Sequence, residues 1–367
     1  MATIANEANE ANRARGVDSW DDLRRDAAAR AATVGLPTRA SEAWRYVDCA
    51  PLAHEPAAEA APAITVLPGS TGWKSGPIEP ALVRERWAKA VVDTTDIGQI
   101  WSWSQLRDTL HLHLPKGAQG HLHCRIETPG GWHGYRILIS VDRGAVGSLV
   151  LEHALGAARA CTGMDVDVAQ GGSLTVEEIQ SGADAAQLLS SAAISIDRDA
   201  QVTWTSAWRG GALVRAHQDV RLTASGASID FAGLARVAGK RQAHQYLRVA
   251  HVVGDTRSRQ LVKNVIDDTA RASFDGLIHV AKGADRSDAE QLNHNLLLAP
   301  GGRADTRPQL DIHADEVKAA HGATVGRPED EQITYLRTRG LDSETARTLV
   351  QQGFSDEILH RFRHVHP

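Results

Sequence analysis

Cysteine is scarce in this chain of 367 residues. Its three cysteines, Cys49, Cys124 and Cys161, are widely spaced and odd in number. That distribution argues against a disulfide framework and against a self-contained CxxC metal or cluster site. If sulfur or cluster chemistry takes place here, a second chain must supply part of the site. We expect Cys124 and Cys161 to be small apolar fillers and Cys49 to pack with Trp44.

Long apolar runs and a dominant charge are also missing. No segment reaches the roughly 18 apolar residues that span a bilayer, and the opening MATIANEANEANRARG is unlike a signal peptide. The net charge is -5 with arginines mixed among Asp and Glu, which gives no basic stripe for nucleic acid and no polybasic membrane patch. We expect a cytoplasmic protein that binds neither nucleic acid nor membranes. The chain has no GxxxxGK(S/T) motif, so it is not expected to bind ATP as an NTPase does.

The residues that are present divide the chain into three zones. With 42% hydrophobic residues the chain can bury a sizeable core, in two or three domains. The first zone, residues 1–100, is predicted to be a helical region with a linker. A helix is expected from Val17 to Val34, capped by Asp18 or Ser19 and stopped by the Gly-Leu-Pro of residues 35–37. The stretch HEPAAEAAPAI that follows indicates a loose connector.

The middle zone, residues 101–316, consists of short alternating strands separated by Gly, Asp, Ala and Ser turns. Strand starts recur at Ser148, Ser173, Val202 and Ser228, and then at Ser273 after a longer interval that could hold an extra turn or an insertion. A recurrence in the range of roughly 20 to 50 residues is typical of a solenoid. We favour a β-helix over a β-sandwich, which strands at this spacing would also suit. All nine tryptophans lie at or before Trp208, so later coils must be filled by smaller residues.

The third zone, residues 317–367, is predicted to be a small helical domain, because the hydrophobic period changes to about 3.6 after His321. We expect three short helices. The first runs from Pro328 to Gly340, the second is capped by Ser343 and ended by Gly353, and a third begins at Ser355. Three short helices make too small a core to stand alone, so their apolar residues must pack on the solenoid or on another protein.

Residues 271–358 carry a family resemblance. In order they contain NHNLLL, PQLDIHADEVK, HGATVG, YLRTRG and ARTLVQQGF. This series resembles the C-terminal half of SufD, in the SufB/SufD family of the SUF iron–sulfur cluster assembly system. Upstream, SEAWRYVD and LHLPKGAQG resemble earlier elements of that family. The paralogue SufB typically has His-Glu-Ala where this chain has HGA, which favours SufD. The resemblance implies a right-handed parallel β-helix between an N-terminal helical region and a C-terminal helical domain, a mainly β fold.

The resemblance also implies a role. The chain would be a non-catalytic scaffold subunit that pairs with a SufB-like paralogue through the β-helix end, while a SufC-like ABC ATPase hydrolyses ATP. It would form a homodimer when alone, and a self-pairing adaptor without its own cluster chemistry is the alternative function. Docking of the ATPase would involve the C-terminal helices, with the candidate residues Tyr335, Leu336, Arg339, Leu349, Phe354 and Ile358.

His321, in HGATVG, is the candidate cluster and interface residue. In the family this histidine is thought to face a SufB cysteine, which makes it an iron ligand that acts with a partner cysteine on a transient, shared iron–sulfur cluster. Many members have Cys two positions earlier, where this chain has Ala319, so the thiolate must come from the partner. The competing interpretation is a histidine bonded to a backbone carbonyl. Binding of reduced flavin is left open.

Other clusters admit structural explanations. His111, His113, His121 and His123 alternate as a strand pair would, which could build a zinc site but also suits solvent-facing strands. The pair at residues 267–268, both Asp, is the strongest hint of a β-helix carbohydrate enzyme. His294, together with Asn293 and Asn295, is expected to form a side-chain ladder along stacked coils.

Overall fold

The computed structural model describes residues 20–38, 40–53, 63–79, 82, 96–365 and 367. The N-terminal region contains helix α2 (Trp20–Val34), the 3-10 helices η1 (Glu42–Trp44) and η2 (Ala50–Ala53), and helix α4 (Ile97–Ser104). Gly35, at φ 69°, follows the end of α2, as the predicted stop requires. The predicted caps at residues 18 and 19, and most of the connector, lie outside the described residues.

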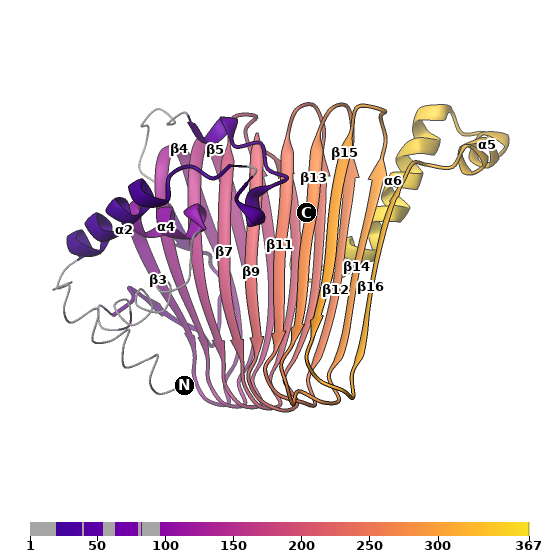
Figure 1. The fold of residues 1–367 in the computed structure, drawn as a ribbon. Coiled ribbons are helices and arrows are strands. Elements are labelled where there is room, and N and C mark those ends of the chain that lie inside the picture. The colour runs from indigo at the N-terminus through magenta and orange to yellow at the C-terminus, as the bar shows by residue number, and fades with distance from the viewer. Residues whose placement is uncertain (1–19, 39, 54–62, 80–81, 83–95, 366) are drawn as a thin grey trace.

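A sixteen-stranded sheet wound into a solenoid follows (Figure 1). Its path is β15-β13-β11-β9-β7-β5-β6-β8-β10-β12-β14-β16, and all these neighbours pair in parallel. The predicted mainly β, parallel solenoid is confirmed, and the sandwich is excluded. The strands are β1 (Ala63–Val66), β2 (Lys74–Gly76), β3 (Leu106–Leu114), β4 (Gln119–Val141), β5 (Val146–Val168), β6 (Ser173–Gly182), β7 (Gln187–Ile196), β8 (Gln201–Gly210), β9 (Leu213–Leu222), β10 (Ser228–Val237), β11 (Gln242–His251), β12 (Arg257–Ile266), β13 (Arg271–Val280), β14 (Asp288–Leu297), β15 (Arg303–Ile312) and β16 (Lys318–Gly326).

The strand recurrence was only partly understood from the sequence. Ser228 begins β10, but Ser273 lies in β13, which belongs to the other face of the solenoid. The next strand on the face of β10 is β12, which begins at Arg257. The expected extra turn or insertion is therefore wrong. Each coil carries two strands on two faces, and the interval from Ser228 to Ser273 joins strands of different faces.

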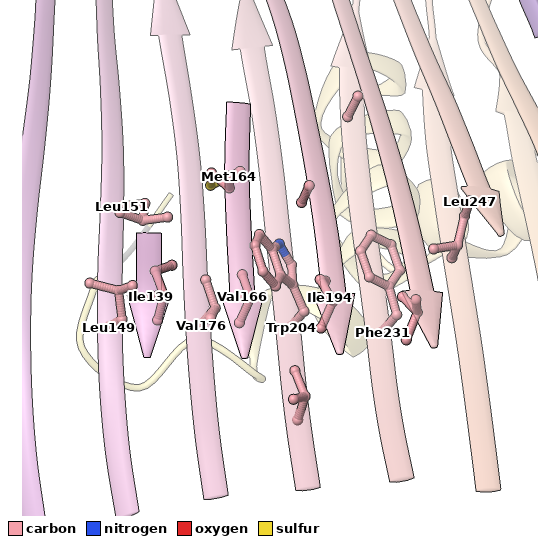
Figure 2. Close-up of a cluster of buried hydrophobic side chains, with 14 of the residues drawn as sticks. Ile139, Leu149, Leu151, Met164, Val166, Val176, Ile194, Trp204, Phe231 and Leu247 are labelled. Carbon is pink, nitrogen blue, oxygen red and sulfur yellow. The ribbon is translucent and has the colours of Figure 1, made fainter. Parts of the chain in front are cut away.

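The solenoid interior is filled by side chains that stack in register from coil to coil. Leu149, Val176, Trp204 and Phe231 occupy equivalent positions on β5, β6, β8 and β10, and all are fully buried (Figure 2). Fully burying one such side chain is worth about 1.5–3 kcal/mol. Because every coil adds one residue to each column, the core grows as a rod rather than a sphere.

The C-terminal helices differ from the prediction. They are two, α5 (Asp330–Thr338) and α6 (Ser343–Leu359), and α6 continues through Gly353. Its N-cap is Asp342, whose carboxylate accepts a hydrogen bond of 2.8 Å from the Thr345 amide. Ser355, expected to start a helix, is buried within α6 and donates to the Gln351 carbonyl. The unbroken helix lets its last turns reach the solenoid, which offsets the modest helical cost of one glycine.

Strand β16 lies beyond the boundary expected after residue 316. It pairs with β14 along nine residues, so the solenoid continues to Gly326.

Candidate functional site

The two last strands of the solenoid each have one neighbour. β15 pairs with β13 and β16 pairs with β14, and both stand at the ends of the strand order. Figure 1 shows them at the end of the solenoid opposite α2 and α4. Within the described residues their outer edges meet no further strand. We call this region, strands β15 and β16, the open end.

The open end is much more exposed than the coil beneath it. Most of β13 is buried, whereas no residue of β15 or β16 is. Ile312 at 37% and Val325 at 49% are among the most exposed large apolar residues of the described chain. Long exposed strand edges with apolar residues pair readily with other strands. The open end thus has the properties of an interface.

His321 lies in the middle of β16. Its register partner on β14 is Gln291, which is fully buried and faces the interior, so the two residues share the inner face of the sheet. His321 is nevertheless exposed, because no coil covers it. Its imidazole makes no hydrogen bond with any described residue, so the carbonyl contact of a structural histidine is absent there. Ala319, two positions earlier, is half-buried against the last coil.

The interior changes character toward the open end. The column of Trp204 and Phe231 continues with Gln260, Gln291 and then His321. The Gln291 side-chain amide donates to the Gln260 Oε1 atom at 2.8 Å. A polar interior column reaches the surface at His321, whereas the same column is apolar in earlier coils.

The predicted side-chain ladder is confirmed for the asparagines, but the inclusion of His294 is wrong. The Asn264 amide donates to Asn295 at 2.7 Å, and the Asn295 amide donates to Asn293 at the same distance. His294 points to the other face, where it contacts the Thr324 hydroxyl at 2.8 Å. Burial and the charge of Lys263 lower the pKa of His294.

The second half of α6 is anchored on the solenoid. Ile358 and Phe362 are buried against Ala232, Leu234 and Leu261. Lys263 forms an ion pair of 2.6 Å with Glu357 and donates to the Phe354 carbonyl at 2.9 Å. Beyond the helix, His364 and the amide of Arg363 both contact the buried carboxylate of Glu177 at 2.9 Å.

The other part of the helical domain is free of the solenoid. Helix α5 has no buried residue, and it packs with α6 beyond the end of the sheet (Figure 1). Tyr335 is 57% exposed, and the Arg339 guanidinium lies 5.1 Å from the centre of its ring. Leu349 is 41% exposed. Tyr335 on α5, Arg339 at the C-cap of α5 and Leu349 on α6 thus expose aromatic, cationic and apolar side chains.

Three predicted docking residues are less available. Leu336 and Phe354 are half-buried, and Lys263 covers the Phe354 ring at 4.7 Å. Ile358 is fully buried by the solenoid, so its inclusion among residues that meet a partner is contradicted by this packing. The helical period of the sequence identified an apolar face but could not say what covers it.

The four early histidines do not converge on one point. Each contacts a residue one coil further on, through the pairs His111–Ser140, His113–Asp142, His121–Ser148 and His123–Glu152, at 2.8 to 3.3 Å. None belongs to the one His, Cys, Asp and Glu cluster with metal-ligand spacing that the described chain contains. The zinc-site alternative is not supported.

The acidic pair at residues 267 and 268 is a turn. Asp267 accepts from the Asp268 amide at 2.8 Å, and Asp268 accepts from the Gly239 amide at 2.9 Å. Asp268 has a φ of 52°, a left-handed conformation that Asp tolerates in turns. Both carboxylates stabilise the backbone, so the carbohydrate-enzyme alternative loses its main support.

A buried ionic cluster escaped the sequence analysis. Asp96, the N-cap of α4, contacts Arg215 at 2.7 Å and His217 at 3.1 Å, and His217 contacts Asp219 at 3.0 Å. Burial alone would lower the pKa of His217, but the charges and hydrogen bonds of Asp219 and Asp96 raise it to about 9. The cluster borders a cavity of about 990 Å³ between η1 and the sheet. No local motif joins residues 121 positions apart, so sequence offered no signal.

The cysteines lie where the sequence analysis expects them. Cys124 and Cys161 are fully buried, and Cys49 is partly buried in the same cluster as Trp44. Burial raises the pKa of the Cys124 and Cys161 thiols to about 12 and that of Cys49 to about 11. Such thiols remain protonated and are poor metal ligands.

No helix among the described residues is long and apolar enough to cross a membrane.

Comparison with known proteins identifies relatives. The family model for the SufBD core domain, "SUF system FeS cluster assembly", matches residues 125–354. The iron–sulfur cluster assembly protein SufD of Escherichia coli (strain K12) is 38% identical over 154 residues, which cover 42% of this chain and 36% of that protein. An iron–sulfur cluster assembly SufBD family protein of Mycobacterium tuberculosis (strain ATCC 25618 / H37Rv) is 31% identical over 250 residues, 66% of this chain and 59% of that protein. The chain spans less than two thirds of the length of both relatives.

Proposed function

The chain belongs to the SufB/SufD family of iron–sulfur cluster assembly proteins and is SufD-like, and on this basis we propose that it is a scaffold subunit whose open end pairs with a SufB-like paralogue. One observation carries the proposal. Strands β15 and β16 end the solenoid, their outer edges meet no further strand of the described chain, and His321 is exposed on the inner face of β16. The end strands of a partner solenoid could pair with β15 and β16 and so extend both faces of the sheet. This pairing would remove the exposed edges from solvent.

His321 has the proposed role of an iron ligand at that joint. A neutral imidazole nitrogen binds iron, and the exposed position leaves room for a ligand from a partner. The thiols of Cys124 and Cys161 are buried, that of Cys49 is partly buried, and the pKa values of all three are raised. Ala319 offers no sulfur near His321. A cysteine of the partner would therefore complete the site. Because this chain would supply a single ligand nitrogen, that of His321, it would hold the growing cluster weakly enough for the cluster to be released.

The exposed helical surface of Tyr335, Arg339 and Leu349 is the proposed dock for a SufC-like ABC ATPase. Aromatic and arginine side chains are enriched among residues that dominate interface energies. Ile358 and the Lys263–Glu357 ion pair hold the C-terminal end of α6 on the solenoid. A movement of α5 and α6 caused by the ATPase would therefore be transmitted to the sheet. ATP hydrolysis belongs to the partner, and this chain acts without catalysing a reaction.

Co-expression with the SufB-like and SufC-like proteins of the same source, followed by native mass spectrometry and iron analysis, tests the proposal. We expect a mixed complex. His321→Ala should preserve the complex and lower its iron content, whereas His294→Ala, on the opposite face of the neighbouring strand, should not. Tyr335→Ala with Leu349→Asp should release the ATPase alone.

Point variants are preferable to removing α6. A truncation after Arg327 would strip Ile358 and Phe362 from the sheet and leave Glu177 without its partners, so it would confound docking with folding. Equal iron content in the His321→Ala and unmodified complexes would remove His321 from the site.

A second copy of the chain is the alternative occupant of the open end. The exposed Ile312 and Val325 favour pairing of this edge with any matching one, and a two-fold axis can place two identical edges together. A chain found only as a homodimer, unchanged by either partner, would make it a self-pairing adaptor.

A further inference from the structure

The outer face of the open end carries a cluster that the proposed function does not use. His279 lies in β13, Asp311 lies beside it in β15, and His313 follows β15. The His279 Nδ1 atom is 2.7 Å from Asp311 Oδ2, and the His313 Nε2 atom is 2.8 Å from Asp311 Oδ1. One ligand atom from each residue lies within 4.8 Å of the others. In the described part of the chain no other three His, Cys, Asp or Glu residues gather this closely.

The backbone places these side chains together. His279 and Asp311 are direct register partners, and their neighbours Ile278 and Val280 are buried toward the interior, so both point outward. His313 comes two residues after Asp311 and returns to the same face. The His279 and His313 rings lie 5.5 Å apart. Two hydrogen-bonded strands therefore hold the cluster.

The ion pairing of Asp311 differs from that of three other carboxylates of the last coils. Arginines neutralise those: Asp275 pairs with Arg307, Asp288 with Arg259, and Asp305 with Arg303. The ion-pair partners of Asp311 among the described residues are the imidazoles of His279 and His313, and no Lys or Arg of the described chain pairs with it. Two imidazole nitrogens therefore flank this carboxylate without a Lys or Arg beside it, which leaves its oxygens available to a cation.

We propose that His279, Asp311 and His313 bind a divalent metal ion of the borderline class, such as Zn²⁺ or Fe²⁺. Two imidazoles and one carboxylate suit these ions, whereas Mg²⁺ and Ca²⁺ prefer oxygen ligands alone. The side chains are 37%, 49% and 55% exposed, so water completes the coordination. Bond lengths of about 2.0–2.2 Å require the imidazoles and the carboxylate to turn toward a common point, which their exposure permits. The site lies in this chain alone and does not depend on a partner or on His321.

Co²⁺ and Zn²⁺ are suitable probes for the purified, metal-free full chain. Co²⁺ titration followed by visible absorption should show one saturable equivalent, and equilibrium dialysis should give the same stoichiometry for Zn²⁺. Asp311→Asn keeps the size and hydrogen-bonding capacity of the residue but removes its charge. We expect it to weaken binding at least about tenfold, and His279→Ala with His313→Ala to abolish this equivalent.

Two controls separate this site from other histidines. His294→Ala and His321→Ala, on β14 and β16, should retain the Co²⁺ equivalent. Zn²⁺ should raise the thermal midpoint of the unmodified chain but not that of Asp311→Asn, because ligands that bind only the folded state stabilise it. Circular dichroism checks that each variant folds. Equal affinity in Asp311→Asn and the unmodified chain, or loss of the equivalent in His321→Ala, would overturn the proposal.

Discussion

The two ends of the solenoid are finished in opposite ways. At the first coil, β1 and β2 pair antiparallel with β4 and β3, and α2 and α4 cover further surface. At the last coil, the outer edges of β15 and β16 meet no further strand of the described chain, and the helical domain extends beyond them (Figure 1). Solenoids need capped ends to remain soluble and unpaired. The covered end is thus built for stability, and the open end is left available for another chain.

Breaking the attachment of the N-terminal elements η1 and α4 to the solenoid should have the largest effect on stability. Arg215→Ala removes one ion-pair partner of buried Asp96 and a guanidinium that lies 3.9 Å from the centre of the Trp44 ring. Loss of one partner of a buried pair costs about 3–5 kcal/mol of unfolding free energy. Urea denaturation measures it. Arg248→Ala, which removes a 3.8 Å pair with partly exposed Asp219, is the matched control and should cost less than about 1 kcal/mol.

The same cluster predicts a pH dependence. The pKa of His217 is about 9 in the folded chain, above its usual 6.5. Its stabilising contribution is therefore complete below pH 6.5 and is lost as the pH rises from 6.5 through 9. The loss has an upper limit of about 3 kcal/mol. Urea denaturation between pH 6 and pH 10 checks this, and His217→Gln should flatten the curve. An equally steep curve in that variant would show that another group titrates.

A smaller effect is expected in β12 and β14, in the coils next to the open end. Gln291→Leu removes the donor that bonds to the buried side-chain Oε1 atom of Gln260. The free energy of unfolding should fall by about 1–3 kcal/mol. Replacing both glutamines by leucine removes the two polar groups together and should cost less than the single change. A double-mutant cycle by urea denaturation tests this. Additive losses would mean that the amide pair contributes no coupling.

The smallest effect on stability, with the largest on association, is expected at the edge. Val325→Lys adds a charge on β16 at a residue that is 49% exposed. The free energy of unfolding of the isolated chain should change by no more than about 0.5 kcal/mol. Lysine on an edge strand opposes strand pairing. Analytical ultracentrifugation should show lost pairing with the SufB-like partner or with a second copy. Leu36→Lys, an exposed apolar residue of the covered end, should leave pairing intact.

Period and composition were sufficient for the architecture. Alternation with small turn residues predicted the solenoid, and the change of period after His321 predicted the helices. Prediction failed where a residue's role depends on what lies over it. Gly353 is compatible with a helix end or a helix interior, and contact of Ile358 and Phe362 with the sheet favours the longer helix. An apolar residue such as Ile358 suits contact with the solenoid and contact with a partner equally well, so its residue type did not predict which of the two it makes.

By itself, the sequence determined the mainly β class, the stacked coils, the burial of the cysteines, and the motifs around His321, because these follow from local periodicity and residue chemistry. Tertiary structure alone decided which strands are left unpaired, that Asp96 meets His217, and that His279, Asp311 and His313 share one face. These contacts join residues far apart in the chain or on successive coils. Their distances depend on the number of residues per coil and on the parallel register, which alternation within one strand does not specify.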